Sequence, residues 1–239
     1  DMNSINFKRR LNTNFHDLIE FNINYKHVNF HLLNDDEYEF ENKIDETPFI
    51  PKGTNEEILD AFYKVASVQE YALLKRMKHT NAKIIVIGIS GGLDSTLALL
   101  IAVETLRHMN RPLTDIVAVT MPGFATTSRT KDNATKMMEA LGVTMLEKPI
   151  ALECQIHFKT IEQDPLNHDI TYENTQARIR TLILMNLANK LNGIVLGTGD
   201  LSELALGWCT YNGDQMSMYG INAGVPKTLV RFMIKYYAL

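Results

Sequence analysis

A six-residue loop, Ser90 to Ser95, lies between two apolar runs and constrains the fold more than any other stretch. The run before it, residues 83–89, is short and rich in β-branched residues, which is typical of a buried strand. The run after it, residues 96–103, is rich in leucine and alanine and predicts a buried helix. A strand, a glycine-rich turn and a helix N-terminus direct several backbone N–H groups into one concavity. The sequence therefore predicts a phosphate-binding loop in an α/β protein.

The residue types in this loop suit a phosphate. Gly91 and Gly92 carry no Cβ and let the backbone approach an anion closely, and Ser90 and Ser95 add hydroxyl donors. The carboxylate of Asp94 would repel phosphates unless a cation lay between them, so we predict that Asp94 is a Mg²⁺ ligand. The alternative is an ordinary strand-to-helix turn built from small residues.

Two common phosphate motifs do not match this loop. The P-loop pattern requires a lysine that is absent here, and the dinucleotide pattern GxGxxG fails because position 90 is serine. The loop does resemble the SGGxDS motif of the PP-loop ATP pyrophosphatases, a family whose members bind ATP, release pyrophosphate and transfer AMP to a substrate oxygen.

The composition is that of an ordinary globular chain of 239 residues, with 45% hydrophobic and 22% charged residues. A net charge of −4 does not favour nucleic-acid or membrane partners, and no apolar run approaches the ~20 residues of a membrane span. The N-terminal residues lack the apolar core of a signal peptide. Cys154 and Cys209 are the two cysteines and form no CxxC pair, so we expect no disulfide or zinc scaffold and a cytoplasmic location.

The first 50 residues differ from the rest of the chain. They have weak periodicity and many Asn, Asp and Glu residues, and we interpret them as an arm with short strands that ends at Pro48 to Pro51. This arm is either a linker between domains that contacts a partner subunit or a solvated extension. A capping box, Thr54 with Glu57, then predicts the start of a helix.

Short β-branched or apolar runs predict three further strands, at residues 116–120, 143–146 and 194–196. Helical patterns follow them, at residues 126–141, 174–191, 201–207 and from 225 onward. The stretch between residues 147 and 173 is interpreted as irregular. Its Cys154, His157 and His168 are interpreted as surface or packed residues and not as a metal site.

Several polar groups in these segments have two interpretations. Glu203 stands in an apolar helix, where a carboxylate needs a partner or a metal; the alternative is an exposed helix residue. The loop at residues 121–124 follows a strand and contacts a nucleotide base or ribose, or is a solvated turn. The helix at 174–191 has an apolar stripe that packs either in the core or at a subunit interface. It also has a polar face that either contacts a ligand or is solvated. The stripe is Ile179, Leu182, Ile183 and Leu187, and the face is Glu173, Gln176 and Arg180.

Five motifs taken in order resemble the NAD⁺ synthetases over most of residues 48–239. They lie at residues 88–95, 121–126, 172–180, 197–208 and 222–230. The amino-acid sequences of these motifs most resemble the synthetase half of the large glutamine-dependent enzymes, in which a glutaminase precedes this domain. The resemblance implies an α/β fold with a doubly wound, parallel five-stranded sheet and helices on both faces, like that of the adenine-nucleotide alpha hydrolases.

The resemblance also implies a reaction and a site. Deamido-NAD⁺ attacks ATP to form an adenylate, pyrophosphate leaves, and ammonia displaces AMP to give NAD⁺, with Mg²⁺ as the cofactor. Asp94 and Glu203 are then the catalytic residues and the metal ligands. The implied ATP-binding residues are Gly88, Ile89, Ser90, Gly91, Gly92, Leu93, Asp94, Ser95 and Thr198. The implied deamido-NAD⁺ residues are Asn174, Glu203, Trp208, Cys209, Thr210 and Tyr211, with Arg180 as a further contact.

The resemblance divides the chain at residue 50. Residues 1–50 correspond to the connector from a glutaminase domain, and residues 51–239 to a synthetase domain that is incomplete at its C-terminal end. A homodimer or larger homo-oligomer is implied. The competing hypotheses are another PP-loop enzyme, such as a GMP synthetase or a tRNA-modifying enzyme, and a nucleotide-binding module without turnover. A tRNA enzyme should carry a basic surface, and paired Mg²⁺ ligands are unnecessary in a pure binder.

Overall fold

The computed structural model describes residues 2–11, 26–30, 43–124 and 128–238. The chain divides into two units, residues 1–44 and 45–239. In the first unit, helix α1 spans Met2–Leu11. Our expectation of short strands is wrong for this part of the arm, because its sequence lacks period-two alternation and carries helix-forming Lys, Arg and Leu. The rest of the arm for which we expected short strands lies largely outside the described residues, at residues 12–25 and 31–42.

The second unit is built on a five-stranded sheet in which every pairing is parallel, in the order β3-β2-β1-β4-β5. The strands are β1 (Ile84–Gly88), β2 (Ile116–Thr120), β3 (Thr144–Glu147), β4 (Gly193–Gly197) and β5 (Tyr219–Gly220). The predicted fold class is therefore confirmed. The chain runs outward from β1 to β3 and then returns to β4 on the other side of β1, so the strand order reverses between β1 and β4. Ligands of open α/β sheets bind at such a reversal, beyond the carboxyl ends of the strands.

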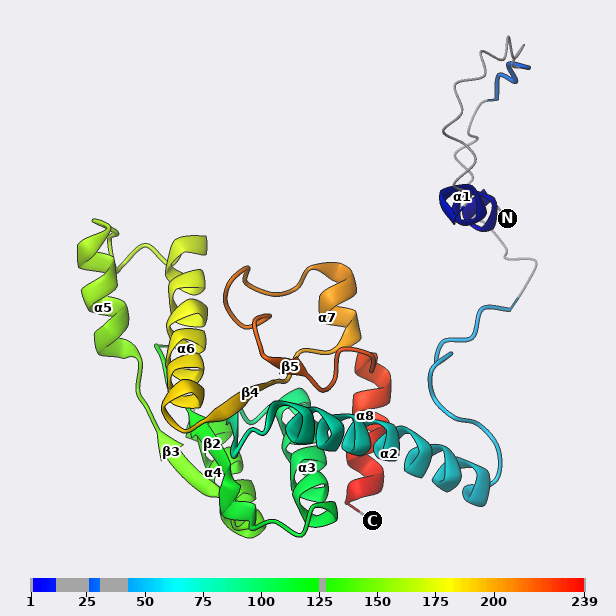
Figure 1. Cartoon of the computed structure of the whole chain (residues 1–239). Helices are drawn as coiled ribbons and strands as arrows, with labels where there is room; N and C mark the ends of the chain where they lie inside the picture. The colour runs from blue at the N-terminus through cyan, green and yellow to red at the C-terminus, as the bar shows by residue number, and fades with distance from the viewer. Residues whose placement is uncertain (1, 12–25, 31–42, 125–127, 239) are drawn as a thin grey trace. The chain divides into compact units, whose positions relative to one another are not determined.

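Helices cover both faces of the sheet (Figure 1). On one face lie α2 (Asn55–Thr80), α3 (Leu93–His108), α4 (Ser128–Leu141) and α8 (Lys227–Tyr237). On the other lies α6 (Ile170–Lys190), with α5 (Ala151–Thr160) packed against it. A short 3₁₀ turn, η2 (Leu113–Asp115), precedes β2, and α7 (Leu201–Leu206) follows β4.

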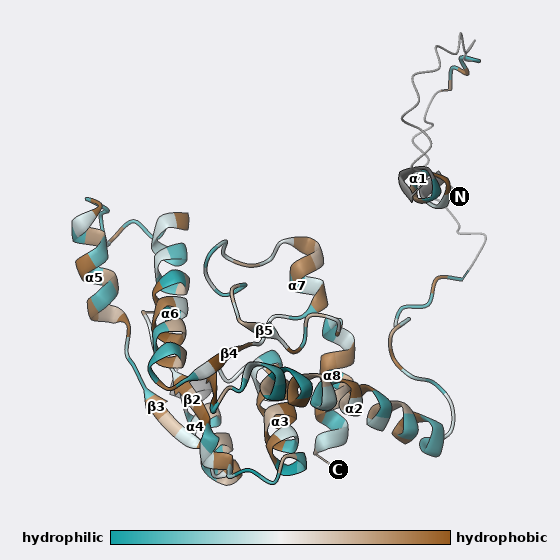
Figure 2. Cartoon of the chain, viewed as in Figure 1, coloured by the Kyte–Doolittle hydropathy of each residue, from teal (hydrophilic) through white to brown (hydrophobic). Residues whose placement is uncertain are grey.

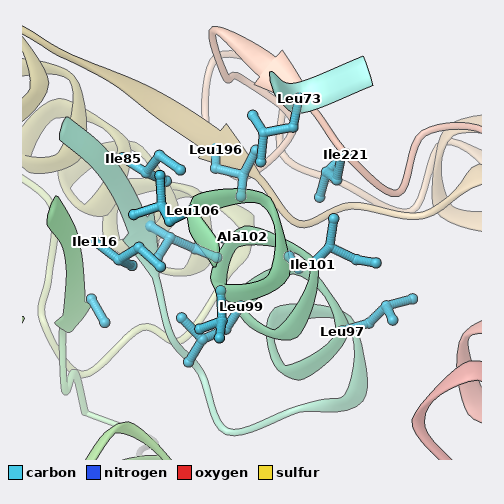
Figure 3. Packing of buried hydrophobic residues seen from close by; sticks show 14 of the residues in the cluster. Leu73, Ile85, Leu97, Leu99, Ile101, Ala102, Leu106, Ile116, Leu196 and Ile221 are labelled. Atoms are coloured by element: carbon cyan, nitrogen blue, oxygen red, sulfur yellow. The ribbon is translucent and has the colours of Figure 1, made fainter. Parts of the chain in front are cut away.

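The alternation of side chains along β1 explains the two layers. Ile85 and Ile87 belong to the larger core around α3, whereas Val86 packs on the opposite face against α6. Because both faces are covered, β1 is apolar throughout, as expected for a parallel sheet. Figure 3 shows the larger core, in which residues of α3 meet Leu73 of α2 and Ile221 beyond β5. Figure 2 shows apolar residues along α3 and hydrophilic ones at the start of α2.

Most predicted elements lie within a few residues of their expected bounds. The Thr54 capping box is present, with Glu57 accepting from the Thr54 N–H, and Gly142 takes the left-handed conformation after α4. Pro226 is the N-cap of α8. Among the described residues, no helix has both the length and the apolar character needed to span a bilayer.

Three predictions about elements need correction. The stretch after β3 contains a helix, α5, whose Cys154 and Phe158 are buried against Tyr172. Helix α6 begins at Ile170 and not at residue 174, because Asp169 caps it by accepting from two backbone N–H groups. Within the predicted stripe of α6, Leu182 is 59% exposed, since the helix turns Leu184 and Ala188 toward the sheet instead.

Candidate active site

The predicted phosphate-binding loop connects β1 to α3 at the strand-order reversal. Gly91 adopts φ +80°, a left-handed conformation that favours glycine, and Gly92 is the N-cap of α3. The hydroxyl of Ser90 accepts from the Gly92 N–H at 3.2 Å and lies 3.2 Å from that of Ser95. No side-chain cap satisfies the first turn of α3 within the described structure. Its N–H groups and the helix dipole are thus available to an anion.

Three carboxylates meet beside this loop. Asp94 lies in the first turn of α3, Asp200 is the N-cap of α7, and Glu203 lies three residues further on. One carboxylate oxygen from each lies within 4.8 Å of the others. Asp200 is fully buried, and about one third of the Glu203 side chain is exposed.

The amino group of Lys227 lies among the three carboxylates. As the first residue of α8, it brings Nζ to 2.6 Å from Asp94 Oδ2, 2.7 Å from Asp200 Oδ2 and 3.4 Å from Glu203 Oε1. The contact with Asp200 is an ion pair without good hydrogen-bond geometry, because Oδ2 has no hydrogen-bond partner. Three carboxylates therefore share one ammonium, and negative charge is in excess.

The pKa values of these groups reflect the excess of negative charge. Burial raises the pKa of Glu203, and the charges of Asp94 and Asp200 raise it further against the opposing effect of Lys227. Burial also acts to raise the pKa of Asp200, but the adjacent Lys227 ammonium and the hydrogen bond from the Glu203 N–H outweigh it and lower that pKa. Burial acts to lower the pKa of Lys227, but its contacts with Asp200 and Asp94 raise it overall. Lys227 therefore stays charged at neutral pH.

Two members of the cluster were missed at the level of sequence. The prediction named Asp94 and Glu203, whereas Asp200 and Lys227 entered only as letters of longer motifs. Asp200 could have been found as a capping box with Glu203: each side chain accepts from the other residue's N–H. The capping box also corrects our reasoning about Glu203. We argued that its carboxylate needs a partner or a metal, and the Asp200 N–H in the same turn is such a partner, so a ligand is not required to explain its position.

The donor set of this cluster fits Mg²⁺. Magnesium prefers carboxylate oxygens together with water and phosphate, and three carboxylates converge here beside a phosphate-binding loop. Oδ1 of Asp94 is buried and has no hydrogen-bond partner among the described atoms, so it has an unused lone pair. Asp94, Asp200 and Glu203 are the residues that could hold the ion.

A cavity of about 620 Å³ extends from the loop across the strand ends. Six of the predicted ATP-binding residues line it: Gly88, Ile89, Ser90, Asp94, Ser95 and Thr198. Gly91, Gly92 and Leu93 lie in the loop but not along the cavity wall. At the β2 end, the wall is formed by Met121, Pro122 and Arg180, whose Nε donates to the Met121 carbonyl at 3.2 Å. Burial lowers the pKa of this guanidinium.

The predicted deamido-NAD⁺ residues are divided between this cavity and a more exposed group outside its wall. Thr210 donates from its hydroxyl to Asn174 Oδ1 at 2.8 Å, so these two residues meet as expected. Cys209 lines the cavity together with Glu203. Trp208 and Tyr211 do not line it and are 75% and 72% exposed. Of the polar face of α6, Gln176 is buried and accepts from the Phe124 N–H at 3.3 Å, whereas Glu173 is exposed.

Known proteins are similar to this chain in sequence. The family model "NAD synthase" matches residues 65–239. A glutamine-dependent NAD(+) synthetase of Mycobacterium leprae is 46% identical over 199 residues, covering 81% of this chain and 29% of that protein. One from Acinetobacter baylyi is 35% identical over 156 residues, covering 64% of this chain and 28% of that protein. The chain thus spans under a third of the length of these relatives.

Solved structures agree with the fold. The glutamine-dependent NAD⁺ synthetase of Acinetobacter baumannii in complex with ADP superposes with a TM-score of 0.68 at 31% identity, covering 73% of this chain and 32% of that one. An NH3-dependent NAD synthetase of Campylobacter jejuni gives a TM-score of 0.66 at 24% identity, covering 74% of each chain, and supports the fold alone. With a family model matched over residues 65–239 and a phosphate loop beside a carboxylate cluster, this chain belongs to the NAD synthase family.

Proposed function

We propose that this chain holds the synthetase site of a glutamine-dependent NAD⁺ synthetase, which uses ATP to convert deamido-NAD⁺ to NAD⁺. The observation that carries the proposal is one cavity lined by both the phosphate loop and two members of the carboxylate cluster, Asp94 and Glu203. Family membership disfavours a GMP synthetase or a tRNA-modifying enzyme. The excess of carboxylates favours turnover over simple nucleotide binding, since a pure binder needs no ligands for a divalent cation.

The chemistry requires two displacements. A carboxylate oxygen of deamido-NAD⁺ attacks the α-phosphorus of ATP, the bond to the β-phosphate oxygen breaks, and pyrophosphate leaves. Ammonia then attacks the carbonyl carbon of the adenylate, loses a proton to solvent, and AMP leaves with the bonding electrons. Neither step needs a protein nucleophile, so the chain contributes positioning and charge stabilisation.

We assign the residues of the loop and the cluster as follows. The N–H groups at the start of α3 and the hydroxyls of Ser90 and Ser95 bind phosphate oxygens. Asp94, Asp200 and Glu203 hold Mg²⁺, which when bound neutralises charge on the triphosphate. The ammonium of Lys227 stabilises the cluster by pairing with its carboxylates.

For the dinucleotide we propose the group around Asn174 and residues 208–211. The Asn174–Thr210 hydrogen bond joins α6 to the segment after α7, and the exposed rings of Trp208 and Tyr211 offer flat faces for stacking. Arg180 supplies a cation at the far end of the cavity. The relatives are named glutamine-dependent, which supports glutamine as the source of the ammonia. We propose that a glutaminase domain supplies it and that residues 1–50 are the connector. We retain the cytoplasmic location and the homo-oligomer as parts of this proposal.

The proposal is tested by NAD⁺ formation from deamido-NAD⁺, ATP and Mg²⁺, with either ammonium or glutamine as the nitrogen source. Ammonium should support NAD⁺ formation by this chain, with a rate that rises toward pH 9 as more NH₃ is present. Glutamine should give none, because the synthetase site needs a free amine. Pyrophosphate release should depend on deamido-NAD⁺. Pyrophosphate release that is independent of deamido-NAD⁺, or efficient use of glutamine by this chain, would overturn the assignment.

A further inference from the structure

A buried amide pair lies behind the candidate site and takes no part in the roles assigned above. Asn222 is fully buried just after β5, and Gln69 of α2 is 6% exposed. The amide nitrogen of Asn222 donates to the backbone carbonyls of Asp94 at 2.9 Å and Thr198 at 3.1 Å. Gln69 Nε2 donates to Asn222 Oδ1 at 3.1 Å and to the Ile221 carbonyl at 3.0 Å.

The two carbonyls belong to the two segments that carry the carboxylate cluster. One is the carbonyl of Asp94 itself, in the first turn of α3, and the other lies two residues before Asp200. A single NH₂ group therefore joins the α3 end of the cluster to its α7 end. Since Asp94 and Asp200 repel each other, the bond works against the separation that their charges favour.

The segment that follows Asn222 is held to the same two ends. The Val225 N–H donates to the Asn222 carbonyl at 2.9 Å, and the Leu201 N–H donates to the Val225 carbonyl at 3.0 Å. Lys227 donates from its backbone N–H to Ser202 Oγ at 3.1 Å, while its Nζ reaches the carboxylates. Asn222 is thus the buried start of the turn that delivers Lys227 to the cluster.

Only an amide meets the requirements at this position. The two carbonyls can accept but not donate, so the group facing them must supply two hydrogens. The opposite side of the group must accept from Gln69. An aspartate has the same shape but would set acceptors against acceptors, and a leucine would leave two buried carbonyls unpaired.

We propose that Asn222 is a positioning residue that sets the separation between Asp94 and the Asp200–Glu203 pair, and that Gln69 fixes the orientation of its amide. This rests on the proposed function, because the consequence is a cluster spaced for Mg²⁺ beside ATP. Displacement of a reacting group by about 1 Å can cost on the order of 100-fold in rate. Loss of the Asn222 bridge therefore weakens cation-dependent ATP binding and not only stability.

The experiment compares Asn222→Leu, Asn222→Asp, Gln69→Met and the Asn222→Leu/Gln69→Met double variant. Three quantities are measured: the dissociation constant for Mg²⁺–ATP, the Mg²⁺ concentration for half-maximal pyrophosphate release, and amide hydrogen exchange in residues 93–97 and 198–203. Asn55→Asp, at an exposed position of α2, is the control for replacing an amide with a carboxylate. Leu73→Ala, in the core face of α2, is the control for lost stability.

We expect both Asn222 variants to raise the dissociation constant and the half-saturating Mg²⁺ at least ~10-fold and to speed exchange in both segments. Gln69→Met should give about a threefold change, and in the double variant it should add little to Asn222→Leu, since Gln69 acts through Asn222. Leu73→Ala should lower the melting temperature without changing the half-saturating Mg²⁺, and Asn55→Asp should behave as the unmodified chain.

The outcomes separate this inference from the proposed function. Exchange at unmodified rates in both segments of Asn222→Leu, or equal changes in half-saturating Mg²⁺ for Asn222→Leu and Leu73→Ala, overturns the positioning role. If the unmodified chain does not bind Mg²⁺–ATP, the proposed function is contradicted, and hydrogen exchange alone then decides whether Asn222 holds the two segments together.

Discussion

Helix α8 contributes to two polar clusters, one at each of its ends, and each cluster contains a buried carboxylate. At its first residue, Lys227 meets Asp94, Asp200 and Glu203. At its last residue, Tyr237 donates to Glu70 Oε1 at 3.1 Å, and Glu70 Oε2 lies 2.9 Å from His108 Nε2. Both clusters place a buried carboxylate between elements that are far apart in the sequence.

The clusters differ in the balance of charges and donors. Near Tyr237, one carboxylate has a partner for each of its oxygens, which satisfies a buried acid. Near Lys227, three carboxylates share one ammonium, and Asp94 Oδ1 has no hydrogen-bond partner among the described atoms. A balanced cluster stabilises the packing of α2, α3 and α8, whereas an unbalanced one leaves room for a cation. A buried acid alone therefore does not point to a functional site, whereas three carboxylates that share one ammonium beside a cavity do.

Removing a carboxylate from the unbalanced cluster should have the largest effect. Asp94→Ala deletes the residue that faces both the phosphate loop and the cluster. We expect pyrophosphate release to fall at least ~100-fold, on the order of 3 kcal/mol in transition-state terms. The check is steady-state pyrophosphate release at saturating ATP, with circular dichroism to establish that the variant folds. Near-normal turnover would contradict the role of Asp94.

Removing the Lys227 ammonium should destabilise the same carboxylate cluster. Lys227→Met leaves the fully buried Asp200 without its ammonium, which we expect to cost about 2 kcal/mol, less than for a fully buried pair because Lys227 is partly exposed. Thermal unfolding with and without Mg²⁺ measures this. The ion should raise the melting temperature of Lys227→Met more than that of the unmodified chain, since a divalent cation can replace the lost charge. An equal shift in both proteins would argue against a cation site.

In the balanced cluster, Tyr237→Phe should cost about 1.5 kcal/mol, the typical value for a hydrogen bond to a charged group. Burial raises the pKa of Tyr237, and the Glu70 carboxylate raises it further. Its contribution is therefore complete below the unfolded pKa of about 10 and is lost as pH rises above that value. Urea unfolding from pH 8 to 11 should show a shallower alkaline decline for Tyr237→Phe. Parallel curves would show that Tyr237 does not titrate differently on folding.

The smallest effect is expected at His108. Its side chain is 42% exposed, so its pair with Glu70 is screened by solvent, and His108→Gln should cost less than about 1 kcal/mol at neutral pH. The same variant should leave the half-saturating Mg²⁺ unchanged, because the cluster near Tyr237 lies outside the site. A change in Mg²⁺ dependence would remove the distinction between the two ends of α8.

Local sequence patterns determined the strands, most helix ends and the phosphate loop. The β-branched runs of β1 and β2, the Thr54 capping box and the glycines at 91 and 92 act through neighbours a few residues away. The structures that they form can therefore be predicted from a short stretch of sequence. Even the missed Asp200 cap belongs to this class. The two-residue strand β5 does not, because nothing in Tyr219–Gly220 except pairing with β4 makes it a strand.

Only the tertiary structure decided which charges meet. Asp94 and Lys227 are 133 residues apart, and Asn222 reaches Asp94 across 128, so no local pattern relates them. The parallel sheet brings these segments together because its strand order reverses between β1 and β4, which places the loops after both strands at one edge. The sequence thus determined an α/β protein with a glycine-rich loop between β1 and α3 and acidic residues near that loop. Packing of α8 and the turn at Asn222 decided that these acids form one cluster around one ammonium.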